Sequence, residues 1–139
     1  MFVPDEHGSY APVPTAVAFQ WLSEAANNSD TFQRLVQEGE HPVPGGGVKD
    51  ESYLSIEGGL FGSKDRTILI IENASHKGIS FDPSTLVKGH HPSRVETLAF
   101  PNLLNLEKKA ADIETQNSAG PISILPFSLT RIVWDKKSP

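Results

Sequence analysis

The strongest constraint on the fold is a series of short apolar segments in the second half of the chain, each bounded by residues that favour turns. Isoleucine, valine, leucine, phenylalanine and threonine dominate the segments, and Gly, Pro, Asn, Asp or Ser stands between them. This pattern is typical of β-strands. We expect strands at residues 53–61, 67–73, 78–81, 95–100, 122–125 and 127–134. Strands at this spacing, in a chain of one domain's length, predict an antiparallel β-sandwich of two sheets.

Two of these strands indicate what surrounds them. Residues 68–71 are Ile-Leu-Ile-Ile, so both alternating sets of side chains are apolar, as in a central strand that is covered on both faces. In the last strand, Leu129 and Val133 point to one face, and Ile132 and Trp134 point to the other. We expect Trp134 to be partly exposed because it lies next to the charged tail.

The interruptions between strands are also informative. Pro126 separates the last two expected strands, and we expect it at a bulge or a sheet edge because proline has no N–H to donate to a ladder. Residues 101–121 allow two interpretations: a long loop with one strand inside it, or a short helical turn at Leu103, Leu104 and Leu106.

The beginning of the chain has a helical pattern instead. A helix is expected over residues 14–26, since apolar residues recur there at i, i+3, i+4 and i+7. This face consists of Ala18, Trp21, Leu22 and Ala25. Val17 and Phe19 widen the apolar surface, so the helix is expected to pack on more than one side.

A second, shorter helix is expected over residues 30–38. Asp30 can cap it, Gln33 stands in capping-box position, and Gly39 can end it. Its apolar face would consist of Phe32, Leu35 and Val36.

The sequence HPVPGGG at 41–47 then breaks regular structure. We therefore expect a mainly β protein, an antiparallel two-sheet β-sandwich preceded by one or two short helices. A lead-in with helices and a linker would occupy residues 1–47, and the sandwich would occupy residues 48–139.

Charge and composition exclude several functions. The formal net charge is −5 and the basic residues are scattered, so neither a nucleic acid nor a membrane surface is an expected partner. The chain has no cysteine, which excludes disulfides, zinc–thiolate sites and thiol nucleophiles. No apolar run has the length of a transmembrane helix. The first residues lack the pattern of a signal peptide, so either the protein stays in the cytoplasm or the chain is a piece of a longer protein that is secreted.

No group of residues has the pattern of a catalytic or metal site. His90 and His91 are adjacent, but neither an acidic residue nor a third histidine stands at ligand spacing. Glu57 and Glu72 lie on expected strands and invite comparison with a glycosidase acid/base pair, yet outward-facing strand charges explain them more simply. The nucleophile-elbow, P-loop and dinucleotide-binding motifs are absent. We expect no catalytic residue, no cofactor and no metal.

Aromatic side chains are the remaining candidates for ligand contact, because flat rings stack on the apolar faces of sugars. Trp21 belongs to the expected buried face of the helix, so core packing is its expected role. Tyr10, Tyr53 and Phe61 lie in segments where exposure is plausible, and they are the candidate carbohydrate contacts.

Three stretches, taken in order, resemble the end of a retaining glycoside hydrolase of the large (β/α)8 clan. Residues 9–25, SYAPVPTAVAFQWLSEA, are similar to the helix that closes the barrel in these enzymes, which has a sequence pattern such as YxPxPxxxAFxxLSE. Residues 65–82 resemble a strand pair that has the sequence pattern LLxxNxS. Residues 121–134 resemble a terminal strand that has the sequence pattern xxLPPxSLTxLxW. The nearest families suggested by these sequence patterns are the arabinofuranosidases and the related arabinoside and xyloside hydrolases.

The resemblance implies a C-terminal β-sandwich whose catalytic residues lie on barrel strands outside this chain. It implies a non-catalytic accessory domain that supports or shapes a neighbouring catalytic barrel. A carbohydrate-binding module acting alone through exposed aromatics is the alternative, and a small free-standing enzyme is least expected. The expected partner is a catalytic glycoside hydrolase domain or a polysaccharide. Because the helix is apolar around much of its circumference, self-association through the helix around Trp21 is also expected.

Overall fold

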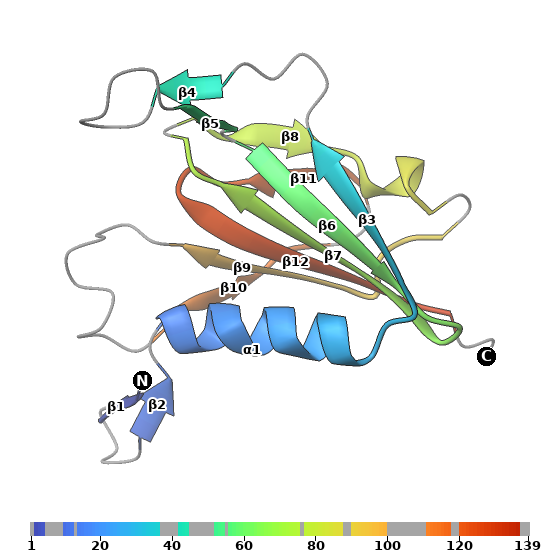
Figure 1. The fold of residues 1–139 in the computed structure, drawn as a ribbon, viewed down its shortest axis with the longest axis horizontal. Coiled ribbons are helices and arrows are strands. Elements are labelled where there is room, and N and C mark those ends of the chain that lie inside the picture. Colours follow the sequence, from blue (N-terminus) through green and yellow to red (C-terminus); the bar gives the residue numbers. More distant parts are fainter. Residues whose placement is uncertain are drawn as a thin grey trace.

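A six-stranded antiparallel sheet with one α-helix across one face forms the body of the molecule (Figure 1). The computed structural model describes residues 2–4, 10–12, 14–36, 42–44, 52–54, 56–75, 77–87, 90–99, 111–117 and 120–136. Within them the helix is α1 (Pro14–Asn27), close to the bounds expected from the sequence. No helix in this part of the chain is both long and apolar enough to span a membrane.

The strands of the large sheet lie in the order β10-β9-β12-β7-β6-β3. Their bounds are β3 (Thr31–Val36), β6 (Ile56–Gly62), β7 (Arg66–Asn73), β9 (Arg94–Ala99), β10 (Ile113–Thr115) and β12 (Ser128–Asp135). A second, two-stranded sheet pairs β8 (Ile79–Phe81) with β11 (Ile122–Ile124), and a 3-10 turn, η1, covers Pro83–Thr85. Two short hairpins complete the described elements: β1 (Phe2–Pro4) with β2 (Tyr10–Pro12), and β4 (Pro42–Pro44) with β5 (Ser52–Leu54).

Strand β7 has an apolar core on each of its faces, as expected for residues 68–71. Ile68 and Ile70 pack with the helix side of the sheet, whereas Leu69 and Ile71 pack on the opposite side. Its neighbour β12 divides in the predicted way: one core contains Leu129 and Val133, and the other contains Ile132 and Trp134. The two central strands thus separate two hydrophobic cores.

The core opposite the helix is closed by the β8–β11 sheet, which gives the sandwich its second layer. Ile122 and Ile124 of β11 are buried there. The expectation that Trp134 is partly exposed is wrong, since only 1% of its surface is accessible. The residue alternates inward at the end of β12, so strand geometry decides its burial and the nearby charged tail does not.

Pro126 lies in a turn where the chain passes from one sheet to the other. β11 pairs with β8, whereas β12 pairs with β7 and β9, so the ladder has to stop between them. Phe127 in this turn has φ +46° and donates its N–H to the Ser75 carbonyl at 3.1 Å. The side chain of Asn73 ties the end of β7 to the same region by donating to the carbonyl of Leu125 at 3.0 Å.

The expected second helix over residues 30–38 is wrong: residues 31–36 form the edge strand β3. The strand pairs with β6 from Thr31 opposite Gly62 to Val36 opposite Glu57, and Asp30 donates its N–H to the Gly62 carbonyl at 2.8 Å. A nine-residue helix has little stability of its own in water. Pairing along the whole of β3 therefore outweighs the local capping signals.

Much of the first 47 residues belongs to the same packed body as the large sheet. Val17 and Trp21 share a core with β7 and β12, and β3 extends that sheet. The predicted boundary between residues 47 and 48 lies outside the described residues. In the stretch 101–121, β10 is the strand expected inside a loop, whereas Leu103, Leu104 and Leu106 lie outside the described part.

Candidate interaction surface and groove

Helix α1 carries two apolar stripes, and only one of them faces the sheet. Val17, Trp21 and Ala25 are buried in the core beneath the helix. Phe19 and Leu22 are 67% and 46% exposed, and Ala26, at the same helical spacing, is exposed as well. We call Phe19, Leu22 and Ala26 the outer stripe. Leu22 was expected on the buried face, and this expectation is wrong because the helix is rotated so that Trp21 takes the central position.

An arginine under the helix fixes this rotation. The buried Arg131 of β12 lies over the Trp21 ring, with its Cζ 4.6 Å from the ring centroid. It bonds Glu24 of α1 at 3.3 Å and Glu96 of β9 at 2.8 Å, and Arg94 contacts Glu96 at 2.8 Å. Because Arg131 contacts Trp21 and Glu24 from the sheet side of α1, the outer stripe faces away from the sheet.

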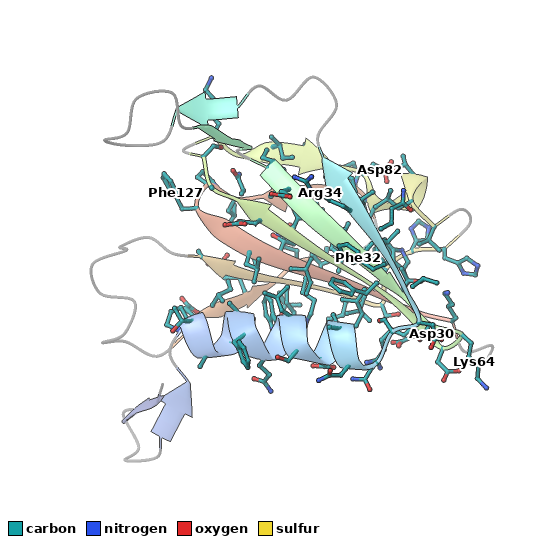
Figure 2. The ribbon with its side chains drawn as sticks, in the orientation of Figure 1. Asp30, Phe32, Arg34, Lys64, Asp82 and Phe127 are labelled. Carbon is teal, nitrogen blue, oxygen red and sulfur yellow. The ribbon has the colours of Figure 1, made fainter. Side chains whose placement is uncertain are left out.

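A groove of about 300 Å³ lies between the outer stripe and the edge of the sheet. Its apolar lining includes Leu22 of α1, Phe32 of β3, Phe61 and Gly59 of β6, Ile70 of β7 and Leu129 of β12. The Phe32 and Phe61 rings lie 5.1 Å apart, tilted by 52°. Figure 2 shows Asp30 just before β3, and Phe32 and Arg34 along the strand, away from the end of α1.

The glycine in the groove wall allows the Phe32 ring to lie close to the strand. A Cβ at Gly59 would come within 2.8 Å of Phe32 Cε2 and 3.1 Å of Phe61 Cε2. Phe32 nevertheless remains 62% exposed. One ring surface thus covers the glycine while the rest of the ring faces solvent.

One end of the groove is polar. Arg34 donates from Nε to the Glu57 carboxylate at 2.6 Å, and Glu57 lies directly opposite Glu72 in the β6–β7 ladder. Glu72 is exposed, and no hydrogen bond or ion pair links its side chain to the described residues. The two carboxylates considered from the sequence are therefore cross-strand neighbours that share the groove with Arg34.

A larger, more polar cavity of about 560 Å³ lies beside the C-terminal end of α1. Three of its charged groups pair with one another: Arg66 contacts Asp135 at 3.0 Å and Glu24 at 3.8 Å. These pairs join α1, β7 and β12, so a structural role accounts for these three charged side chains in the cavity wall. Across the described residues, no three His, Cys, Asp or Glu side chains gather to hold a metal ion.

The sequence candidates are dispersed in the structure. Phe61 lies in the groove, half-buried. Tyr10 lies in β2 opposite Pro4, and Tyr53 lies in β5 opposite Val43, but their side chains lie outside the described part of the molecule. His90 and His91 are exposed in the loop before β9.

Phe32 and Arg34 were not among the candidates expected from the sequence, and Leu22 was expected on the buried face. Phe19 was expected to widen the apolar surface of the helix, and it lies in the outer stripe. Reading residues 30–38 as a helix assigned Phe32 to a buried face. In the strand β3, Phe32 and Arg34 stand two residues apart and therefore share one face, which places both on the groove.

Near His91, hydrogen bonds from the Ser84 hydroxyl (2.7 Å) and backbone N–H (3.0 Å) hold the pKa of Asp82 below its usual range, with a smaller contribution from the charge of His91.

Comparisons with known proteins include two glycoside hydrolase structures. No family model matches the chain, and no curated protein matches it. An arabinofuranosidase crystal structure is similar over 61% of this chain, with a TM-score of 0.41 and 14% identity. A GH30 endoxylanase from Clostridium papyrosolvens C71 is similar over 73%, with a TM-score of 0.36 and 12% identity. The chain spans 20% and 25% of the length of these two proteins. Both are glycoside hydrolases, the class of protein whose sequence patterns residues 9–25, 65–82 and 121–134 resemble.

Proposed function

We propose that the chain is a non-catalytic accessory domain of a glycoside hydrolase, docked on a catalytic (β/α)8 barrel through the outer stripe of α1. The observation that carries the proposal is the second apolar stripe on a helix whose first stripe already fills the core. A helix that covers only one sheet needs one apolar face, so the outer stripe supports packing against a second body.

The charge distribution on α1 supports the same proposal. The only charged residue of the helix is Glu24, and its carboxylate is directed to Arg131 and Arg66. The exposed residues of the helix are Phe19, Gln20, Leu22, Ala26 and Asn27. Interface cores are depleted of charged residues and enriched in aromatic ones, and this helix surface has that composition.

The pairing of four carboxylates with arginines supports a non-catalytic role. Glu57 pairs with Arg34, and Asp135 pairs with Arg66, while Glu24 and Glu96 both pair with Arg131. A glycosidase instead needs two carboxyl groups on either side of the bond to be cleaved. The resemblance of residues 9–25 to a barrel-closing helix supports a barrel as the second body.

The genomic DNA upstream of the Met1 codon tests the proposal directly. We expect a stretch that encodes a (β/α)8 barrel, in frame or separated by a frameshift. If this stretch is present, the separately produced barrel should bind the chain, and Phe19→Ser with Leu22→Ser should abolish binding. The control pair Gln20→Ser and Asn27→Ser should leave it unchanged.

Two results would contradict the proposal. One is an upstream region without any barrel-coding stretch. The other is hydrolysis of aryl arabinosides or xylosides by the purified chain, which would show that the domain carries its own catalytic site.

A further inference from the structure

We propose that the groove between α1 and β3 binds a neutral saccharide. Phe32 and Phe61 would contact the apolar C–H face of a sugar ring, and Arg34, Glu57 and Glu72 would bond its hydroxyl groups. The inference goes beyond docking, because it concerns the groove rather than the outer stripe and can be tested on the isolated chain.

The shape and lining of the groove fit a small ligand. Its volume of about 300 Å³ lies at the lower end of the range for small-molecule pockets, which are mostly apolar with a few polar groups. Phe32 presents most of its ring to solvent, and Phe61 meets it at a tilt of 52°. The pair forms an angled apolar wall against which one face of a flat ligand can pack.

The polar groups at the end of the groove fit hydroxyl groups in particular. Arg34 uses Nε for Glu57, which leaves its terminal nitrogens as donors. The Glu72 carboxylate offers acceptor oxygens without a partner among the described residues. A sugar hydroxyl both donates and accepts hydrogen bonds, so adjacent hydroxyls of one ring can use the arginine and the carboxylates together.

The charges favour a neutral ligand over a charged one. One arginine and two carboxylates give this end of the groove a net negative charge, so a uronic acid would be repelled. A cationic ligand would find carboxylate acceptors but would lie beside the Arg34 guanidinium. Neutral sugars avoid both penalties.

The position of the groove also suits a ligand site. It opens beside the outer stripe, so in a docked assembly it would lie at the rim of the contact between two domains. Ligand pockets are found preferentially at such domain interfaces. Leu22 belongs to both surfaces, whereas Phe19 belongs to the outer stripe and Arg34 to the groove.

Backbone amide NMR of the isolated chain tests the proposal. The probes are neutral oligosaccharides of xylose, arabinose, glucose and galactose, together with a glucuronic-acid-substituted xylo-oligosaccharide and a glucosamine oligomer. We expect at least one neutral probe to shift Gly59, Phe61 and the Arg34 Nε–H signal in a saturable way. The neutral probe should bind more tightly than the charged ones.

Matched variants locate the site. Phe32→Ala and Arg34→Ala should each weaken binding about tenfold, as expected for a lost ring contact or charge-assisted hydrogen bond. Phe32→Leu should retain part of the affinity because it keeps apolar contact, and Phe19→Ser should change the affinity less than twofold.

Three results would overturn the proposal: no saturable shift with any neutral probe, tighter binding of a charged probe, or unchanged binding in the Phe32 and Arg34 variants. Failure of barrel docking would leave the saccharide result unaffected. Phe19→Ser therefore distinguishes the two proposals, because it should impair docking and preserve saccharide binding.

Discussion

At the scale of single residues, Arg131 determines how α1 lies on the sheet. Its guanidinium contacts the Trp21 ring and bonds carboxylates from the helix and from β9. The residue is buried in a strand whose other neighbours on that face are Leu129 and Val133. A charge in such a place is tolerated only when it is paired, so Arg131, Glu24 and Glu96 act as one unit.

Replacing Arg131 with methionine should lower the free energy of unfolding by about 2–3 kcal/mol, because it leaves Glu24 and Glu96 without their shared partner. Urea unfolding monitored by tryptophan fluorescence measures the change. Arg34→Met is the matched control at an exposed ion pair, with an expected change of about 0.5 kcal/mol or less. Equal midpoints for wild type and the Arg131 variant would show that the buried pairs do not hold the helix.

Asp82 gives a residue-level prediction about pH. The two hydrogen bonds from Ser84 hold its pKa below the usual range, so the ionised carboxylate is favoured in the folded state. Its contribution to stability is therefore present above the unfolded-state pKa and is lost as the pH falls through the lowered folded-state pKa.

A carbon-detected NMR titration should place the Asp82 midpoint below that of an ordinary exposed aspartate, and Ser84→Ala should raise it. Ser80→Ala, close in sequence and exposed, should leave it unchanged. An identical midpoint in the wild type and the Ser84 variant would remove Ser84 as the cause.

At the scale of elements, the two stripes of α1 should respond differently to mutation. Trp21→Ala should cost about 3–5 kcal/mol of unfolding free energy, since it empties a buried site between the helix and the sheet. Phe19→Ala should change it by about 0.5 kcal/mol or less, because its ring is mostly exposed. Urea unfolding of both variants measures the difference, and a large loss for Phe19→Ala would mean that the outer stripe belongs to the domain's own core.

The pattern of apolar residues within each element explains which elements could be predicted from the sequence. β7 and β12 were predictable because their side chains alternate between two apolar cores. In each strand this alternation occurs within one run of consecutive residues. β3 was not, because its apolar residues at 32, 35 and 36 also fit a helical period and its partner β6 begins twenty residues after it ends. Edge strands with one exposed face carry the weakest local signal, and here the edge strand carries Phe32 and Arg34. The groove was missed for that reason, although Phe61 on the neighbouring strand was identified.

At the scale of the whole molecule, the described residues cover the two faces of the large sheet differently. The core opposite α1 is closed by β8 and β11. The helix side has a filled core under α1, but beside and above it lie the groove and the outer stripe. The proposed docking on a catalytic barrel would account for this asymmetry, since the barrel would cover the apolar side and the groove would open at the junction.

The outer stripe should also govern self-association of the isolated chain. Burying two large apolar side chains removes them from water and favours association, so we expect concentration-dependent dimerisation in sedimentation velocity. Phe19→Ser with Leu22→Ser should make the chain monomeric. Trp21 is buried, so it contributes to this behaviour only by holding the helix. A wild-type chain that stays monomeric at millimolar concentration would weaken the case for an interface here.

Hydroxyl-radical footprinting of the native protein, purified from its source, tests the central claim most directly. The rate of Phe19 oxidation is compared with that in the isolated chain of 15.1 kDa, with exposed Phe127 as the internal reference. We predict strong protection of Phe19 in the native protein, together with a glycoside hydrolase barrel in the same polypeptide or complex. Equal oxidation of Phe19 in the two samples would contradict the claim that the outer stripe is a docking surface.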